Sequence, residues 1–288
     1  MMQEARYYHT LTDGRVQCDL CPHGCTLADG QHGRCRNRAN HGGRLYSEVY
    51  GHPCALADDP IEKKPLLHFM PGTHCLSLSC TGCNLRCRNC QNYQISQSAP
   101  IDIKEYPPMS PQAIVDLCIR LPTIAYTYTE PLTYIEYVID IARLARQQGK
   151  RNVLVSAGYV NAKPLADLLP YLDAANIDLK VFSDDIYRHH CGASLQPVLN
   201  TLTAIHQSGV WLEITHLLIP TINDDENMFR RMCQWLVSNK FAMTPLHITR
   251  FFPLYRMRNL YPTPLATMRR FSDIAGEEGI TTVHLGNV

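Results

Sequence analysis

The sequence lacks an excess of charge of either sign, because 27 lysine and arginine residues face 26 aspartate and glutamate residues. This balance argues against the broad positive field that binding to nucleic acid or to an anionic membrane normally requires. The first residues lack the charged and then apolar pattern of a secretory signal, and no apolar run approaches the roughly 20 residues that span a bilayer. We therefore expect a soluble, cytoplasmic protein.

Cysteine, by contrast, is abundant. The 288-residue chain has 13 cysteines, an odd number, and most of them precede residue 91. Since a chain without a secretory signal meets a reducing compartment, a framework of disulfides is not expected. Metal binding explains these cysteines better.

The chain divides into three regions. Residues 1–50 are rich in Gly, His, Asn and Cys with little periodicity, which predicts a cysteine-rich metal-binding module. Residues 51–72 form a predicted linker. From residue 73 to 288, short apolar or β-branched runs alternate with amphipathic stretches, as in repeated βα units. This rhythm predicts an α/β fold with a parallel barrel, closed or open, whose chemistry gathers at the carboxyl ends of its strands.

The predicted elements can be given by residue range. Strands are expected at 44–51, 73–80, 123–130, 152–158, 176–182, 210–219, 245–252 and 281–287. Helices are expected at 110–121, 131–149, 163–170, 185–208, 224–239 and 264–276.

One motif carries the chemistry. The run TGCNLRCRNCQN places Cys83, Cys87 and Cys90 directly after the first strand of the barrel region. Three thiolates suit a [4Fe-4S] cluster, which needs four ligands, so one iron keeps an open position. An open position is typical of a catalytic metal site. The alternative is a closed zinc or electron-transfer site completed by Cys75 or Cys80.

This spacing resembles that of the radical S-adenosylmethionine (SAM) superfamily. More narrowly, DPIEKKPLLHFMPG and GCNLRCRNCQN resemble the radical SAM component of the AmmeMemoRadiSam system, a relative of the pyruvate formate-lyase activating enzymes. The resemblance implies a partial (β/α)6 TIM-type barrel, a [4Fe-4S] cluster and SAM as cofactors, and reductive cleavage of SAM to a 5′-deoxyadenosyl radical. Two positions depart from it: Asn89 replaces an aromatic residue, and Ala157 replaces an asparagine.

The resemblance also implies a set of SAM contacts. They are Glu130, Ser156, Asp178, Lys180, Ile219, Asn223 and His247. A carboxylate such as Glu130 can accept charge-assisted hydrogen bonds from the SAM ammonium. Asp178 and Lys180, two residues apart, share one face of a strand. Each residue also has a structural alternative: a helix-start acid for Glu130, an ion pair for Asp178 and Lys180, and a hydrogen-bonded core residue for His247.

A second group of cysteines lies near the start of the chain. CDLCPHGCTLADGQHGRC contains Cys18, Cys21, Cys25 and Cys35. Four soft ligands at short separations predict a second metal site, and both zinc and an iron–sulfur cluster fit. Free thiols remain an alternative, as do the nearby ligands His23, His32 and His41. The ungrouped cysteines are expected to be packing residues: Cys54, Cys75, Cys80, Cys118, Cys191 and Cys233.

Partners follow from the resemblance. It implies an electron donor such as flavodoxin or ferredoxin, and a protein partner or protein-presented substrate of the Memo-like or AMMECR-like kind, docked with help from the amino-terminal module. Two further hypotheses are an activating enzyme that places a glycyl radical on a partner protein, and a non-catalytic iron–sulfur or zinc protein. The substrate is not identified by the sequence.

Overall fold

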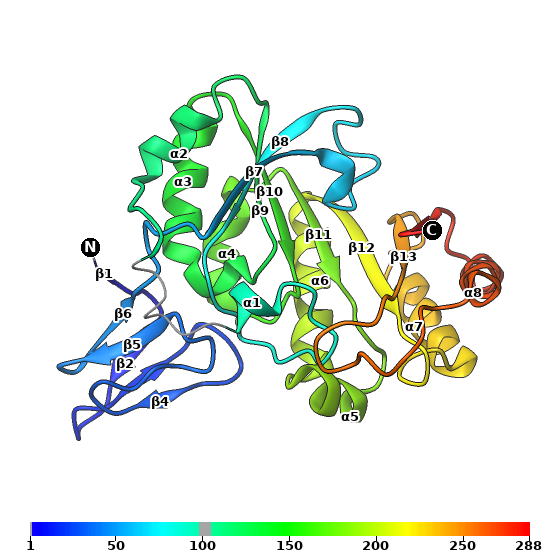
Figure 1. Ribbon diagram of the computed structural model, residues 1–288, viewed down its shortest axis with the longest axis horizontal. Helices are drawn as coiled ribbons and strands as arrows, with labels where there is room; N and C mark the ends of the chain where they lie inside the picture. The colour runs from blue at the N-terminus through cyan, green and yellow to red at the C-terminus, as the bar shows by residue number, and fades with distance from the viewer. Residues whose placement is uncertain (1, 98–104) are drawn as a thin grey trace.

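The computed structural model describes residues 2–97 and 105–288, which form a curved eight-stranded sheet with a small amino-terminal module beside it (Figure 1). The strand order is β14-β13-β12-β11-β10-β9-β8-β7. Neighbouring strands are parallel, except that β7 runs antiparallel to β8. The strands are β7 (Ala55–Pro60), β8 (His74–Ser79), β9 (Thr123–Tyr126), β10 (Arg151–Ser156), β11 (Ala174–Asp178), β12 (Trp211–Leu218), β13 (Leu246–Arg250) and β14 (Val283–Gly286). Six βα units followed by β14 confirm the partial barrel.

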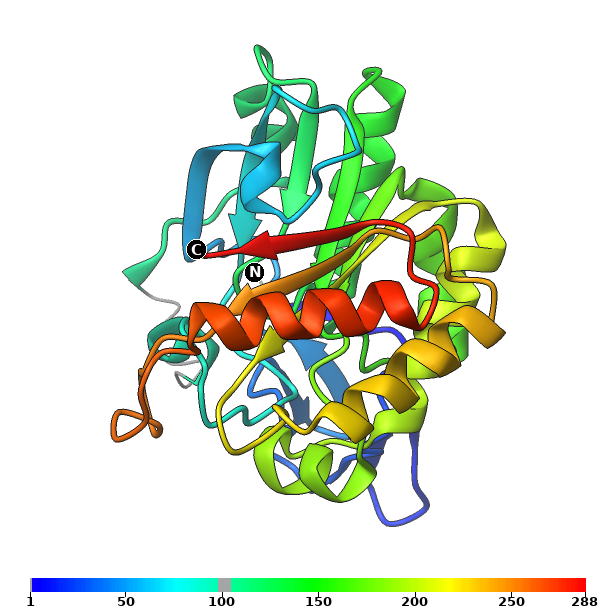
Figure 2. The same cartoon turned by 90° about the vertical axis from the view of Figure 1, so that its right-hand side faces the viewer.

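The helices follow the strands in the expected order. They are α1 (Tyr93–Ser96), α2 (Pro111–Leu117), η3 (Pro131–Tyr134), α3 (Ile135–Gln147), α4 (Ala162–Leu168), η4 (Leu169–Tyr171), α5 (Asp184–Ile186), η5 (Tyr187–Cys191), α6 (Leu195–Ser208), α7 (Glu226–Ser238) and α8 (Leu265–Glu277). The amphipathic α3 buries Val138, Ile141 and Ala142 against the sheet. Figure 2 shows α8 lying along β13 and β14 at the carboxyl-terminal edge. Within the described ranges, no helix is long and apolar enough to cross a membrane.

The single helix expected at 185–208 is divided. A π-helical turn, η5, ends at Gly192, whose φ of 67° lies in the left-handed region where glycine is favoured. The carbonyls of His190 and Cys191 accept hydrogen bonds from the backbone N–H groups of Arg88 (3.1 Å) and Arg86 (2.7 Å). Because these carbonyls bind another segment, they do not continue a helix.

The segment 51–72, expected to be a linker, contributes to the sheet. It contains the edge strand β7 and the 3-10 turn η1 (Ile61–Lys63). Asp59 accepts hydrogen bonds of 2.7 Å from both Lys63 and Lys64, and the side chain of Lys64 is only 1% exposed. Burial alone would raise the pKa of Asp59, but the two lysines outweigh burial and hold that pKa well below its usual range.

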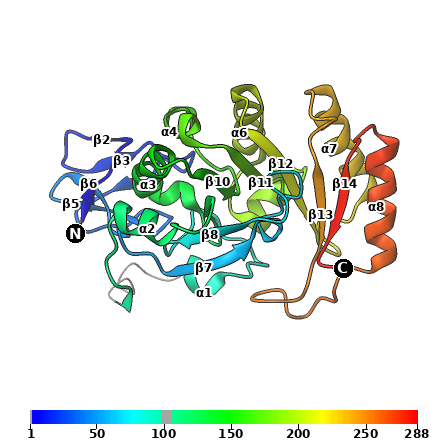
Figure 3. The same ribbon diagram turned by 90° about the horizontal axis from the view of Figure 1, so that it is seen from above.

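The amino-terminal module contains two three-stranded antiparallel sheets, ordered β2-β3-β4 and β1-β6-β5. Their strands are β1 (Gln3–Glu4), β2 (Tyr8–Thr10), β3 (Val16–Cys18), β4 (Thr26–Leu27), β5 (Arg38–His41) and β6 (Arg44–Ser47). The module lies at the end of the molecule opposite to α8 and β14 (Figure 3). An ion pair between Arg38 and Glu136, with side chains 1% and 2% exposed, joins it to α3.

Candidate active site

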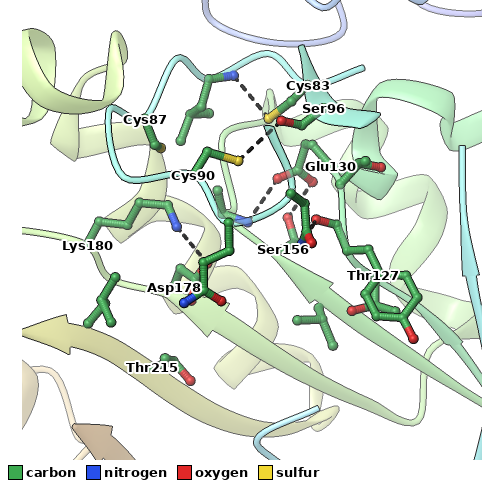
Figure 4. A pocket seen from close by; sticks show the side chains of 18 of the residues that line it. Cys83, Cys87, Cys90, Ser96, Thr127, Glu130, Ser156, Asp178, Lys180 and Thr215 are labelled. Carbon is green, nitrogen blue, oxygen red and sulfur yellow. Dashed lines mark hydrogen bonds and ion pairs between the residues drawn. The ribbon is translucent and has the colours of Figure 1, made fainter. Parts of the chain in front are cut away.

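A cavity of about 510 Å³ opens at the carboxyl ends of the parallel strands. Cys83, Cys87 and Cys90 line it from the loop after β8, and Figure 4 shows polar side chains from the ends of the next strands beside them. Those side chains are Glu130, Ser156, Asp178 and Lys180. The volume lies in the usual range for small-molecule sites. Residues far apart in sequence therefore meet where parallel barrels place their chemistry.

The cysteine loop is held in place by hydrogen bonds to its own backbone and to neighbouring side chains. The backbone N–H of Leu85 donates to Cys83 Sγ at 3.3 Å, and Cys90 Sγ lies 3.2 Å from Ser96 Oγ in α1. From the other side, His190 Nε2 donates to Asn89 Oδ1 at 2.8 Å. Asn89, the departure from the aromatic residue of related sequences, thus ties the loop to η5.

The three thiols differ in their electrostatic surroundings. A hydrogen bond from the Cys191 thiol, followed by the nearby Lys180 ammonium, holds the pKa of Cys87 below its ordinary value. Burial raises the pKa of Cys83. Burial opposes the charge on Lys180, but Asp178, 2.7 Å away, and then Cys87 outweigh it and raise the pKa of Lys180. A cation therefore faces the thiols and favours anionic sulfur.

Glu130 combines a structural role with a position on the cavity wall. Its Oε1 accepts hydrogen bonds from Ser156 Oγ (2.6 Å) and from the Leu132 N–H (3.2 Å) at the start of η3, and its Oε2 accepts from the Ala157 N–H (2.9 Å). Burial raises the pKa of Glu130. Since a carboxylate offers about four lone-pair sites, one remains for a ligand.

Three of the expected SAM contacts lie away from the cavity lining. Ile219 packs in a separate apolar cluster, and Asn223 accepts from the Ile219 N–H and donates to the carbonyls of Lys180 and Leu217. His247 lies deeper in the barrel, where its Nε2 is 2.6 Å from Glu213 Oε2. Asn223 therefore positions the backbone beside the cavity, whereas His247 matches its structural alternative.

Some lining residues were missed by the sequence analysis. Lys63 and Lys64 reach the cavity from η1, and Tyr128 reaches it from the end of β9. Tyr128 has a left-handed φ of 65°, and its carbonyl accepts a hydrogen bond of 2.7 Å from Asn92. The strand-end rule could have drawn attention to Tyr128. Cys191 was expected to be a packing residue. Its distance in sequence from the other cysteines does not indicate that it lies beside Cys87.

The amino-terminal cysteines also lie near one another. Cys18 and Cys25 flank a hairpin between β3 and β4, joined by a backbone hydrogen bond of 2.9 Å. Burial first, and then the charges of neighbouring thiols, raise the pKa of Cys21 to about 12 and that of Cys35 to about 11. Across residues 2–97 and 105–288, no three His, Cys, Asp or Glu side chains converge closely enough to hold one metal ion.

The donor set at the cavity fits an iron–sulfur cluster with an open position. Cys83, Cys87 and Cys90 supply three thiols on one wall, and the remaining wall offers carboxylates and an ammonium group. A [4Fe-4S] cluster takes four ligands, so one iron would face the cavity.

Comparisons with known proteins agree with this geometry. Residues 78–233 match the family model of the radical SAM superfamily. The chain is 43% identical over its whole length to an uncharacterised protein of Methanocaldococcus jannaschii, of which it covers 86%. It is 25% identical to the pyruvate formate-lyase-activating enzyme of Clostridium pasteurianum, over 58% of this chain and 72% of that protein. A solved structure of TYW1 with a lysine-pyruvate adduct bound has the same fold, with a TM-score of 0.53 at 18% identity over 85% of this chain and 87% of that chain. The chain therefore belongs to the radical SAM superfamily.

Proposed function

We propose that this protein cleaves SAM reductively at a [4Fe-4S] cluster held by Cys83, Cys87 and Cys90. The observation that carries the proposal is the shared cavity, where three thiols face the polar ends of β9, β10 and β11. When bound, the cluster and SAM supply the chemistry: one electron from an external donor breaks the sulfonium C–S bond, leaving methionine and a 5′-deoxyadenosyl radical that takes hydrogen from a substrate.

The protein's own groups bind and orient. Glu130, anchored by Ser156 and Ala157, presents one carboxylate lone pair to the ammonium of SAM. Lys180, paired with Asp178 beside the thiols, offsets the negative charge of the thiolates. Burial of Glu130 and Ser156, 1% and 3% exposed, keeps water from competing for these hydrogen bonds.

The substrate in this proposal is presented by a protein. The sheet has two edges, β7 and β14, and Lys63 and Asn287, which follow these strands, both line the cavity. In this proposal, a bulky guest reaches the radical where the cavity is lined by Lys63 and Asn287. A flavodoxin or ferredoxin would supply the electron, and a Memo-like or AMMECR-like protein would present the substrate.

A second candidate function is activation of a glycyl-radical enzyme. Two similar proteins favour it, the activating enzyme of Clostridium pasteurianum and the (2S)-3-sulfopropanediol dehydratase activating enzyme of Klebsiella oxytoca, which is 28% identical over 33% of this chain. In that case the hydrogen would come from a backbone glycine of the partner. A glycyl-radical signal formed on a partner protein would separate the two functions.

The proposal is tested by anaerobic reconstitution with iron and sulfide, followed by SAM and dithionite. We expect 5′-deoxyadenosine from the unmodified protein and none from Cys87→Ala, whereas Cys80→Ala, which alters a buried thiol outside the cavity lining, keeps the activity. If the unmodified protein binds about four irons per chain more than the variant lacking Cys83, Cys87 and Cys90 but forms no 5′-deoxyadenosine, the proposal is wrong.

A further inference from the structure

We propose that Cys18, Cys21, Cys25 and Cys35 hold a second iron–sulfur cluster, docked against the loop that carries the catalytic cysteines. This site is independent of the proposed SAM chemistry, because none of its ligands lines the catalytic cavity.

The first observation is that the thiols share a common space. A methyl group at Gly33 would lie 3.7 Å from Cys35 Sγ and 3.9 Å from Cys25 Sγ, so both sulfurs border the same point. The hairpin bond between Cys18 and Cys25 brings the first and third cysteines together, and Cys21 lies on the turn between them.

The second observation is that donors surround these sulfurs. The backbone N–H of Arg34 donates to Cys25 Sγ at 3.4 Å, and the guanidinium of Arg38 lies 4.0 Å from Cys18 Sγ. Arg38 is nearly fully buried and its single positive charge is offset by Glu136, so it acts on Cys18 Sγ through an N–H group. Hydrogen bonds to sulfur stabilise an anionic metal–thiolate centre.

The lack of a single-ion site among the described residues favours a cluster over zinc. Tetrahedral zinc with Zn–S bonds of about 2.3 Å draws its sulfurs to within about 4 Å of one another. Within residues 2–97 and 105–288, no three His, Cys, Asp or Glu side chains form a group that could hold a single metal ion, and this applies equally to Cys83, Cys87 and Cys90. An iron–sulfur cluster binds each thiolate to a different iron of its core, so its four cysteines need not surround a single ion.

The module also touches the catalytic loop directly. Gly82, with φ of 89°, precedes Cys83, and a Cβ there would lie only 2.5 Å from the carbonyl oxygen of Cys35. On the other side of Cys83, the carbonyl of Asn84 lies 2.9 Å from His23 Nε2. The second cluster therefore anchors both residues that flank Cys83, and its loss would loosen the catalytic loop.

The test uses the full chain with Cys83, Cys87 and Cys90 all changed to Ala, reconstituted anaerobically with iron and sulfide. We expect about four irons and four sulfides per chain, with visible absorption that dithionite bleaches. Adding Cys18→Ser and Cys21→Ser should remove them, whereas adding Cys54→Ser, an ungrouped cysteine, should not. Absence of iron from the triple variant, or one zinc per chain in its place, would overturn the proposal.

The unmodified protein provides the control for misfolding of these variants. Its reconstituted form should bind about eight irons per chain, and Mössbauer spectra should resolve two clusters. A total of about four irons would overturn the second cluster while leaving the proposed SAM chemistry intact.

Discussion

Replacing Glu130 by Ala separates its two roles. The change removes three internal hydrogen bonds, from Ser156, Ala157 and Leu132, and also the lone pair that faces the cavity. A charge-assisted hydrogen bond contributes about 1.5–3 kcal/mol, so the affinity for SAM should fall about ten- to a hundredfold. Iron content should stay near normal, because among the described residues no hydrogen bond joins Glu130 to a cysteine sulfur.

Isothermal titration of the reconstituted protein with SAM, together with thermal unfolding, measures both effects. Glu130→Gln is the matched control, since it keeps the size of the side chain and an acceptor oxygen but removes the charge, and it should lower SAM affinity less than Glu130→Ala. If Glu130→Ala lowers the melting temperature but binds SAM with unchanged affinity, Glu130 only starts η3 and the assignment of the ammonium contact is refuted.

Three further changes probe the surroundings of the site. Asp59→Ala should lower the free energy of unfolding in urea by about 3–5 kcal/mol, because the buried Lys64 loses its anion; an unchanged midpoint would contradict this. Burial lowers the pKa of His216 to about 4, so the folded state resists a proton that the unfolded chain accepts below about 6.5. Stability should therefore fall by about 2 kcal/mol between pH 7 and 5, and His216→Phe should remove that part of the pH dependence in unfolding titrations. Cys191→Ala removes the thiol that lowers the pKa of Cys87 and should make the cluster's reduction potential more negative at equal iron content, as a redox titration would show.

The barrel was predictable because its strands are apolar runs separated by amphipathic helices. The predicted strand at 152–158 and the observed β10 differ only at their ends, and the start of α2 follows from Ser110, whose side chain accepts from the Ala113 N–H as a cap. The break at Gly192 was not predictable, since it depends on carbonyls that bind a loop about a hundred residues earlier in the chain. A local sequence pattern does not show which distant residues will bind these carbonyls.

The site was predictable to the extent that strand ends define it. Glu130, Ser156, Asp178 and Lys180 meet at the cavity because each follows or ends a parallel strand. His247 does not fit this rule, because it is the second residue of β13 and pairs with Glu213, so its SAM contact stays a prediction. The segment 51–72 was predicted to be a linker because of its charged residues, although its strand β7 pairs with β8.

The proposed function requires that SAM binds the open iron of the cluster held by Cys83, Cys87 and Cys90. Electron paramagnetic resonance of the dithionite-reduced protein, with and without SAM labelled isotopically at its amino nitrogen, tests it most directly. We expect SAM to change the cluster signal and the label to alter its hyperfine coupling in the unmodified protein, but not in a variant lacking the three cysteines. Identical spectra with and without SAM would contradict it.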